Sequence, residues 1–221
     1  MTDPALLLGQ AARALARAGL VHAYGDASIR LDEHHFLVTP SVPLGLISID
    51  EPGILVPTNG PLPDGVAGEV LAHQEIYKTR PDVAAIGRVQ PPKLISLSTM
   101  ARVPTPRHGF GAYLSIAYWP DPQLVRTHQK AQELAAHLGE RNANVMRGNG
   151  AIVVADTIQR AVVLAWYLED AARVELDVLH TAGVDALALT DEEARSRATW
   201  SGGIAERMWA FLTAGDARPA D

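Results

Sequence analysis

The chain has 221 residues, and its contents of 48% hydrophobic and 20% charged residues are ordinary for one globular domain with a sizeable core. A formal net charge of −6 without a long basic run argues against nucleic acid and anionic membranes as partners, and the lack of cysteine excludes disulfides, thiolate nucleophiles and cysteine-ligated metals. No apolar run reaches the roughly 18 residues that a membrane-spanning helix needs, and no signal-peptide pattern opens the sequence, so we expect a cytoplasmic protein.

The N-terminal part of the chain predicts one helix followed by antiparallel strands. An amphipathic helical pattern covers residues 4–18, and Asp3 is placed to cap it. Two segments of strand-like composition, 27–31 and 35–39, flank a three-residue turn and predict a β-hairpin. A further short strand is expected at 54–56.

The remainder of the chain alternates between helical and strand patterns. A helical pattern at 69–79 has to stop before Pro81, because proline disfavours the helical conformation in the residue that precedes it. Further helices are expected at 91–100, 122–138, 157–179 and 191–212, the last interrupted at Gly202-Gly203, and further strands at 83–89, 113–119, 144–147 and 151–154.

Helices and antiparallel hairpins interleave in this order without regular βαβ units. No internal repeat, low-complexity tract or long linker divides the sequence, so we expect one domain over residues 1–221, with 215–221 as a frayed tail. The order favours an α/β (α+β) fold, a three-layer α/β/α sandwich around a mostly antiparallel sheet.

Four segments resemble, in order, motifs of the class II aldolase/adducin family. Residues 68–92 read GEVLAHQEIYKTRPDVAAIGRVQPP, similar to the family's helix E-x3-H-x3-Y followed by R-P-D-V and a buried strand ending in H-x-H-P. The other segments are 19–30, 37–41 and 144–169. The resemblance implies the class II aldolase fold for this chain. It also implies a homotetramer with active sites at subunit interfaces, and a small-molecule substrate.

The metal-binding positions of the family are the point at which this sequence departs from it. In the family two histidines of H-x-H and a later histidine hold a divalent metal, and the matching positions here are Arg88, Gln90 and Asn149. Arginine is permanently cationic and does not ligate metals, and amide oxygens are weak zinc ligands. We therefore expect no metal and no other cofactor.

The same three positions suggest a different chemistry. The guanidinium of Arg88 can hold a carboxylate or enolate by two hydrogen bonds, and Gln90 and Asn149 can donate to the same developing oxyanion. The alternative interpretation is a decayed site whose residues only maintain the fold.

Further candidates follow from the resemblance. Glu69 matches the family's acid/base carboxylate, and Asp26 is a second candidate for moving a proton. The positions that hold a substrate phosphate in the family include Asp26 and Gly68, which offer a negative charge and no hydroxyl, so a sugar phosphate is a poor substrate here. His73 shares a helix face with Glu69 and is expected to be a packed structural residue. The substrate-binding candidates are Gly25, Ser28, Thr39, Gln90 and Asn149, with Arg107, His108 and Tyr113 from a glycine-rich loop.

These features favour a metal-independent lyase-type enzyme, for example in secondary metabolism. It would act on a small, non-phosphorylated carboxylate or carbonyl compound by aldol or retro-aldol cleavage, decarboxylation, dehydration or cyclisation. One alternative is a non-catalytic, adducin-like binding or assembly subunit. Another is a metal-dependent lyase or oxygenase with rewired ligands, such as Glu69, His73 or a histidine of a neighbouring subunit.

Overall fold

A single sheet forms the centre of the protein in residues 3–181 and 186–216, which the computed structural model describes. Its seven strands are β1 (Asp26–Arg30), β2 (His35–Val38), β3 (Ile54–Pro57), β4 (Ala85–Val89), β5 (Ile116–Trp119), β6 (Ala143–Met146) and β7 (Gly150–Ala155). They lie in the order β3-β2-β1-β4-β7-β6-β5, and every neighbouring pair is antiparallel except β5 with β6. The mostly antiparallel sheet expected from the sequence is thereby confirmed.

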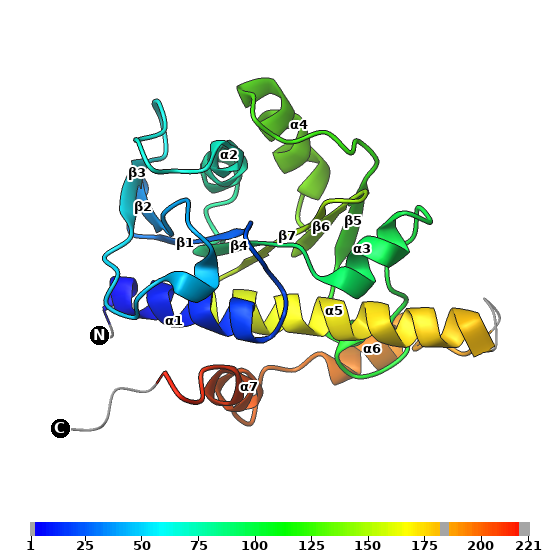
Figure 1. Cartoon of the computed structure of the whole chain (residues 1–221). Coiled ribbons are helices and arrows are strands. Elements are labelled where there is room, and N and C mark those ends of the chain that lie inside the picture. Colours follow the sequence, from blue (N-terminus) through cyan, green and yellow to red (C-terminus); the bar gives the residue numbers. More distant parts are fainter. Residues whose placement is uncertain (1–2, 182–185, 217–221) are drawn as a thin grey trace.

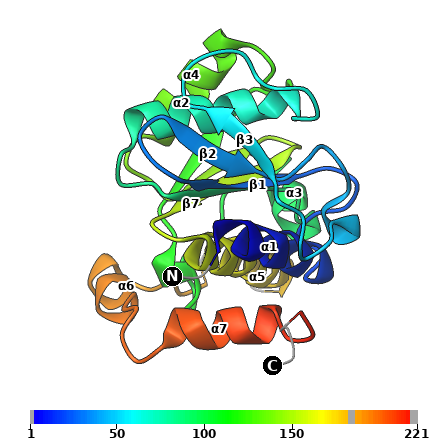
Figure 2. The same ribbon diagram turned by 90° about the vertical axis from the view of Figure 1, so that its left-hand side faces the viewer.

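Helices cover both faces of this sheet. They are α1 (Pro4–Arg17), α2 (Leu71–Thr79), α3 (Pro92–Ser98), α4 (His128–Leu138), α5 (Ile158–Thr181), α6 (Asp191–Arg197) and α7 (Ile204–Leu212). Helices α2 and α4 lie on one face and α1, α3 and α5 on the other, with α7 packed outside α1 and α5 (Figures 1 and 2). The expected three-layer α/β/α sandwich is confirmed. None of the described helices combines the length and the hydropathy that crossing a bilayer requires.

Two hydrophobic cores, one on each face of the sheet, determine where the polar strand residues point. Neighbouring side chains along a strand point to opposite faces. Ala27 packs in the core with α1 and α5, so Asp26 faces α2 on the other side. Ile86 packs in the core beneath α2 and α4, so Arg88, two residues further along β4, also faces α2. The antiparallel register then sets Asp26 directly opposite Arg88.

The helix expected at 122–138 begins later than the sequence pattern suggests. Helix α4 starts at His128, because the hydroxyl oxygen of Thr127 accepts a hydrogen bond from the backbone N–H of Lys130 and caps the helix there. Residues 122–127 form an irregular segment instead, and this segment reaches the site described below.

Smaller corrections concern the strand expected at 113–119 and the C-terminal part. Only Ile116–Trp119 forms the strand β5, because a 3-10 turn occupies Gly111–Tyr113. The sequence predicts a frayed tail from residue 215, but Asp216 is buried and paired with two arginines of α1. The residues after it lie outside the described part of the chain.

Candidate active site

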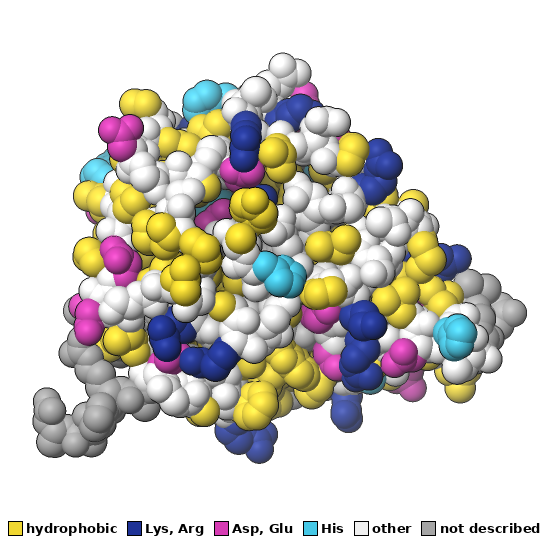
Figure 3. All heavy atoms as spheres, in the orientation of Figure 1, with side chains coloured by type: hydrophobic (Ala, Val, Ile, Leu, Met, Phe, Trp, Pro, Cys, Tyr) yellow, Lys and Arg dark blue, Asp and Glu magenta, His cyan; other side chains and the backbone are white. Residues whose placement is uncertain are grey.

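A pocket of about 580 Å³ opens on the α2 side of the sheet. Its lining comes from the loop before β1, the loop after β2, the turn before α2, the end of β4 and the segment before α4. In Figure 3 a hollow in the face turned to the viewer shows acidic and basic side chains beside one another, with hydrophobic side chains around them. The lining residues that carry the chemistry are Asp26, Thr39, Glu69, Arg88, Gln90 and Arg126.

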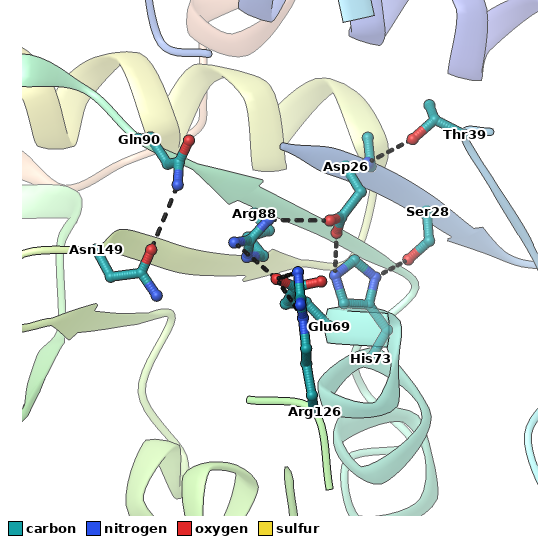
Figure 4. Close-up of polar contacts among 10 residues, drawn as sticks. Asp26, Ser28, Thr39, Glu69, His73, Arg88, Gln90, Arg126 and Asn149 are labelled. Carbon is teal, nitrogen blue, oxygen red and sulfur yellow. Dashed lines mark hydrogen bonds and ion pairs between the residues drawn. The ribbon is translucent and has the colours of Figure 1, made fainter. Parts of the chain in front are cut away.

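Arg88 lies on the floor of the pocket between two carboxylates (Figure 4). Its Nη1 is 3.4 Å from Oδ2 of Asp26, and its Nη2 is 3.7 Å from Oε1 of Glu69. The side chains of Asp26, Glu69 and Arg88 are 3%, 8% and 6% exposed. Burying a charged group costs free energy unless the group is paired with an opposite charge. The placement of the Arg88 guanidinium between the two carboxylates reduces that cost for all three groups.

A second arginine, from the segment before α4, also contacts Glu69. The Nε and Nη2 atoms of Arg126 lie 3.2 and 3.1 Å from Oε1 of Glu69, and the Arg126 side chain is 61% exposed. Glu69 itself sits in a 3-10 turn, Gly68–Val70, which leads directly into α2. The pocket therefore contains two carboxylates and two guanidinium groups within one connected set.

His73 contacts the carboxylate oxygen of Asp26 that Arg88 does not contact. Its Nε2 is 2.8 Å from Oδ1 of Asp26, and its Nδ1 is 2.8 Å from the hydroxyl of Ser28, which lies 2.8 Å from the hydroxyl of Tyr77. His73 is fully buried, as the sequence predicts for a packed residue, but it also positions a pocket carboxylate. Asp, His and Ser appear here in the order of a hydrolase triad, yet Ser28 is fully buried and cannot meet a substrate.

The environment of Asp26 keeps it ionised. Burial alone would raise its pKa, but the nearby His73 and the guanidinium of Arg88 outweigh burial and hold the pKa below its ordinary value of 3.8. At the other end of the chain of contacts, burial raises the pKa of Tyr77 well above its usual range, so its hydroxyl stays protonated.

Gln90 and Asn149 meet at the end of β4. The side-chain amide of Gln90 donates a hydrogen bond to Oδ1 of Asn149 at 3.3 Å (Figure 4). Asn149 lies in the tight turn between β6 and β7. The next residue, Gly150, has a φ of 82°, and a Cβ on it would lie 2.0 Å from the carbonyl oxygen of Val89. Only glycine allows this approach, and the approach is what brings Asn149 next to Gln90.

The side chains at the family's metal position do not fit a divalent ion. Arg88 is a cation with no lone pair to offer, and the amide nitrogen of Gln90 is directed at Asn149. Within the described residues, no group of three or more His, Asp or Glu side chains is arranged to hold a metal. The expectation of a metal-free reaction stays a prediction, supported by this donor set.

The structure brings together most, but not all, of the residues singled out from the sequence. Gly25, Asp26, Thr39, Glu69, Arg88 and Gln90 line the pocket, while Asn149 adjoins it through Gln90 and Ser28 lies behind it.

The three candidates from the glycine-rich loop contact other parts of the chain instead. Arg107 pairs with the buried Glu175 of α5 at 2.6 Å, His108 lies 3.0 Å from Asp170, and the hydroxyl of Tyr113 donates to a backbone carbonyl at 2.6 Å. None of the three loop residues lines the pocket of Arg88. Tyr113 lines a separate pocket of about 910 Å³, and the predicted substrate contacts of the three residues stay predictions.

Sequence reasoning missed Arg126 and the contact between His73 and Asp26. Arg126 lies in a segment that was expected to be helical, and no motif marks it. Prolines at 120 and 122 are the one signal that could have indicated an irregular approach to the helix. The His73 contact depends on how α2 packs over β1, which the sequence pattern does not encode.

Comparison with known proteins identifies the family. The sequence model described as "Class II Aldolase and Adducin N-terminal domain" matches residues 7–176, so the chain belongs to the class II aldolase and adducin family. The resemblance noted in the sequence is thus confirmed. A curated relative, 3,4-dihydroxyphthalate decarboxylase of Terrabacter sp. (strain DBF63), is 27% identical over 198 residues, which cover 81% of this chain and 83% of that protein.

Solved structures agree on the fold. L-fuculose-1-phosphate aldolase from Thermus thermophilus matches with a TM-score of 0.72 and 24% identity over 84% of this chain and 100% of that chain. An aldolase II superfamily protein from Pseudomonas syringae matches with a TM-score of 0.82 and 19% identity, over 95% and 90%. These identities support the fold alone. The expected class, a lyase-like enzyme, is confirmed by the family and by its named decarboxylases.

Proposed function

We propose that this protein is a metal-independent decarboxylase that acts on a small hydroxylated aromatic carboxylate. The observation that carries the proposal is the buried guanidinium of Arg88 on the pocket floor, at the position where the family has a metal-binding histidine. It supplies a fixed positive charge in a pocket whose size, about 580 Å³, suits a substrate of one aromatic ring.

Arg88 retains capacity to bind a further acceptor. Charge-assisted N–H···O contacts are usually about 2.7–2.9 Å long. Its distances to Asp26 and Glu69, 3.4 and 3.7 Å, are considerably longer. A guanidinium carries five N–H donors, so a substrate oxygen can take up the unused ones at shorter distance.

The chemistry follows from where negative charge develops. In decarboxylation of a hydroxylated aromatic acid, the hydroxyl gives up its proton and the ring carbon that bears the carboxylate gains one, which produces a cyclohexadienone. The bond from that carbon to the carboxylate then breaks and carbon dioxide leaves. The electron pair of this bond restores the aromatic ring and leaves the negative charge on the former hydroxyl oxygen. Arg88 lowers the barrier by holding that oxygen, because binding the leaving carboxylate instead would stabilise the starting state as much as the transition state.

Glu69 is the group assigned to the proton transfer. It faces the same pocket as Arg88, 3.7 Å away, and matches the family's acid/base residue. Asp26 stays ionised and fixes the orientation of Arg88. Gln90 lines the pocket beside Arg88 and is assigned to orient the intermediate, supported from behind by Asn149.

The choice of decarboxylation among lyase reactions rests on the relatives. The curated relative named above acts, by its name, as a decarboxylase of a dihydroxylated aromatic acid, and it aligns with most of this chain. Aldol cleavage also leaves negative charge on an oxygen conjugated with the reacting carbon, so the same residues could serve it, and it is the second candidate. The non-catalytic and rewired-metal alternatives find no specific support in the contacts of the described residues.

The test is release of carbon dioxide from hydroxylated benzoates and phthalates by the wild-type chain and by Arg88→Gln. We expect kcat to fall by roughly 100-fold or more in the variant, as for loss of an oxyanion-stabilising donor. Arg88→Lys keeps the charge between the two carboxylates and is expected to stay folded but slow, since ammonium lacks the planar fork.

An exposed arginine, Arg102, provides the matched control, and Arg102→Gln should leave kcat unchanged. Wild-type turnover in folded Arg88→Gln would contradict the proposal, as would a wild-type protein that releases no carbon dioxide from any of these acids.

A further inference from the structure

The pocket contains a second arginine, Arg126, that the mechanism above does not use. It comes from the irregular segment before α4, and its side chain is 61% exposed, against 6% for Arg88. Arg88 is held by carboxylates on two sides, whereas Arg126 is held from one side by Glu69 alone. The two guanidinium groups therefore lie at different depths of one pocket.

Arg126 uses only part of its hydrogen-bonding capacity. Both of its contacts, through Nε and Nη2, go to the same oxygen of Glu69. Within the described residues, its Nη1 makes no hydrogen bond or ion pair. The remaining N–H groups of a planar fork are free to bind a carboxylate that enters the pocket.

The turn before α2 leaves room for this side chain. A Cβ on Gly68 would lie 3.4 Å from Cγ and 3.7 Å from Cδ of Arg126, so a longer side chain there would compete for the same space. Ala67 and Gly68 bring no hydroxyl to the pocket, and the stem of Arg126 lies close to Gly68. The polar contact that this part of the pocket offers to a ligand is thus the guanidinium.

The exposed lining of the pocket includes apolar side chains. Tyr24, Val42 and Leu124 line the pocket and are 71%, 44% and 44% exposed. Exposed hydrophobic side chains at the opening of a pocket favour a ligand with an apolar body, such as an aromatic ring. A ring that rests against these side chains can direct one substituent to Arg88 and another to Arg126.

We propose that Arg126 is the specificity-determining residue of the pocket and binds a second, non-reacting carboxylate of the substrate. The preferred substrate is then an aromatic dicarboxylate rather than a monocarboxylate. This inference rests on the proposed function, because it takes the reacting end of the substrate to lie at Arg88. The second carboxylate would meet a guanidinium whose contacts in the free protein go to a single carboxylate oxygen.

Calorimetric binding of phthalate and benzoate tests this inference, because neither compound carries the hydroxyl needed for turnover. We expect wild-type protein to bind phthalate roughly 10- to 100-fold more tightly than benzoate, the usual worth of a charged hydrogen-bonded pair. Arg126→Gln should lose this ratio by weakening phthalate binding much more than benzoate binding. Arg126→Lys should restore part of the ratio, and the control Arg102→Gln should keep all of it.

The outcomes separate the two proposals. An unchanged phthalate-to-benzoate ratio in folded Arg126→Gln would overturn the role of Arg126 and leave the decarboxylase proposal in place. A wild-type protein without any preference for phthalate would do the same. A protein that prefers phthalate through Arg126 but releases no carbon dioxide from hydroxylated phthalates would overturn the decarboxylase proposal and keep Arg126 as a dicarboxylate-binding residue.

Discussion

At the scale of single residues, Asp26 gives the pocket a pH signature. Its pKa is lowered by His73 and Arg88 in spite of burial, which acts in the opposite direction. A carboxylate with a lower pKa in the folded state stabilises the protein above its unfolded pKa, and this stabilisation disappears as the pH falls through the folded value. Stability should therefore decline below about pH 4, the region of unperturbed aspartate pKa values.

Replacement of Asp26 by asparagine tests this pH dependence. At neutral pH, Asp26→Asn should lower the free energy of unfolding by about 3–5 kcal/mol, because Arg88 and His73 lose a buried partner. Below about pH 4 the difference from wild type should shrink, since Asp26 of the unfolded wild-type chain then binds a proton that the folded chain takes up only at lower pH. Urea unfolding at several pH values measures both effects.

Asp64 provides the control for that experiment. It is exposed in the loop before α2, and Asp64→Asn should follow the wild-type pH dependence. If Asp26→Asn were equally destabilised at every pH, the lowered pKa of Asp26 would not contribute to acid unfolding.

The residues of the pocket differ in how far the sequence predicts them. Asp26, Glu69 and Arg88 stand in motifs with fixed spacing, and the structure brings all three to one pocket. Arg126 belongs to no motif, and it reaches Glu69 across 57 positions of sequence. Such a contact is a product of the packing of α4 against α2, and periodicity along the chain carries no information about it.

At the scale of elements, the start of α4 determines where Arg126 lies. Thr127 caps the helix, so the chain before it is free to turn toward the pocket. Thr127→Ala removes the capping oxygen and should lower the free energy of unfolding by about 1 kcal/mol. Thr127→Ser keeps a hydroxyl and should retain most of the stability. Chemical denaturation of the two variants gives both values.

A cap on a peripheral helix provides the comparison for Thr127. Thr190 caps α6, which buries none of its residues, so Thr190→Ala should change global unfolding less than Thr127→Ala. Equal effects at the two caps would show that the start of α4 has no special weight in the fold.

The order of helices and strands was largely predictable, because apolar periodicity and glycine or proline boundaries mark most elements. The error at 122–138 has a physical cause: the local pattern extends through Leu124 and Val125, but a capping threonine competes with it. Val125 is buried beneath α2 and α4 without being helical. Tertiary packing thus uses an apolar residue that the pattern assigns to the helix.

At the scale of the whole molecule, the charged cluster lies in a pocket on the face of the sheet that α2 and α4 cover (Figure 4). The homotetramer implied by the family stays a prediction, as does the single-domain boundary, because a single chain is described. Whether the protein binds a metal can be tested on the intact chain. No part of the described chain brings together three His, Asp or Glu side chains that could hold an ion.

Metal content is therefore the prediction that bears on the whole protein. Chelator-free wild-type protein analysed by mass spectrometry should contain well below one divalent ion per chain, and a chelator should leave both turnover and Tm unchanged. The matched control restores the family's three imidazoles through Arg88→His, Gln90→His and Asn149→His together. Because imidazole nitrogens suit zinc, this triple variant should bind about one zinc ion per chain. One ion per wild-type chain would instead favour rewired ligands and a metal-dependent lyase.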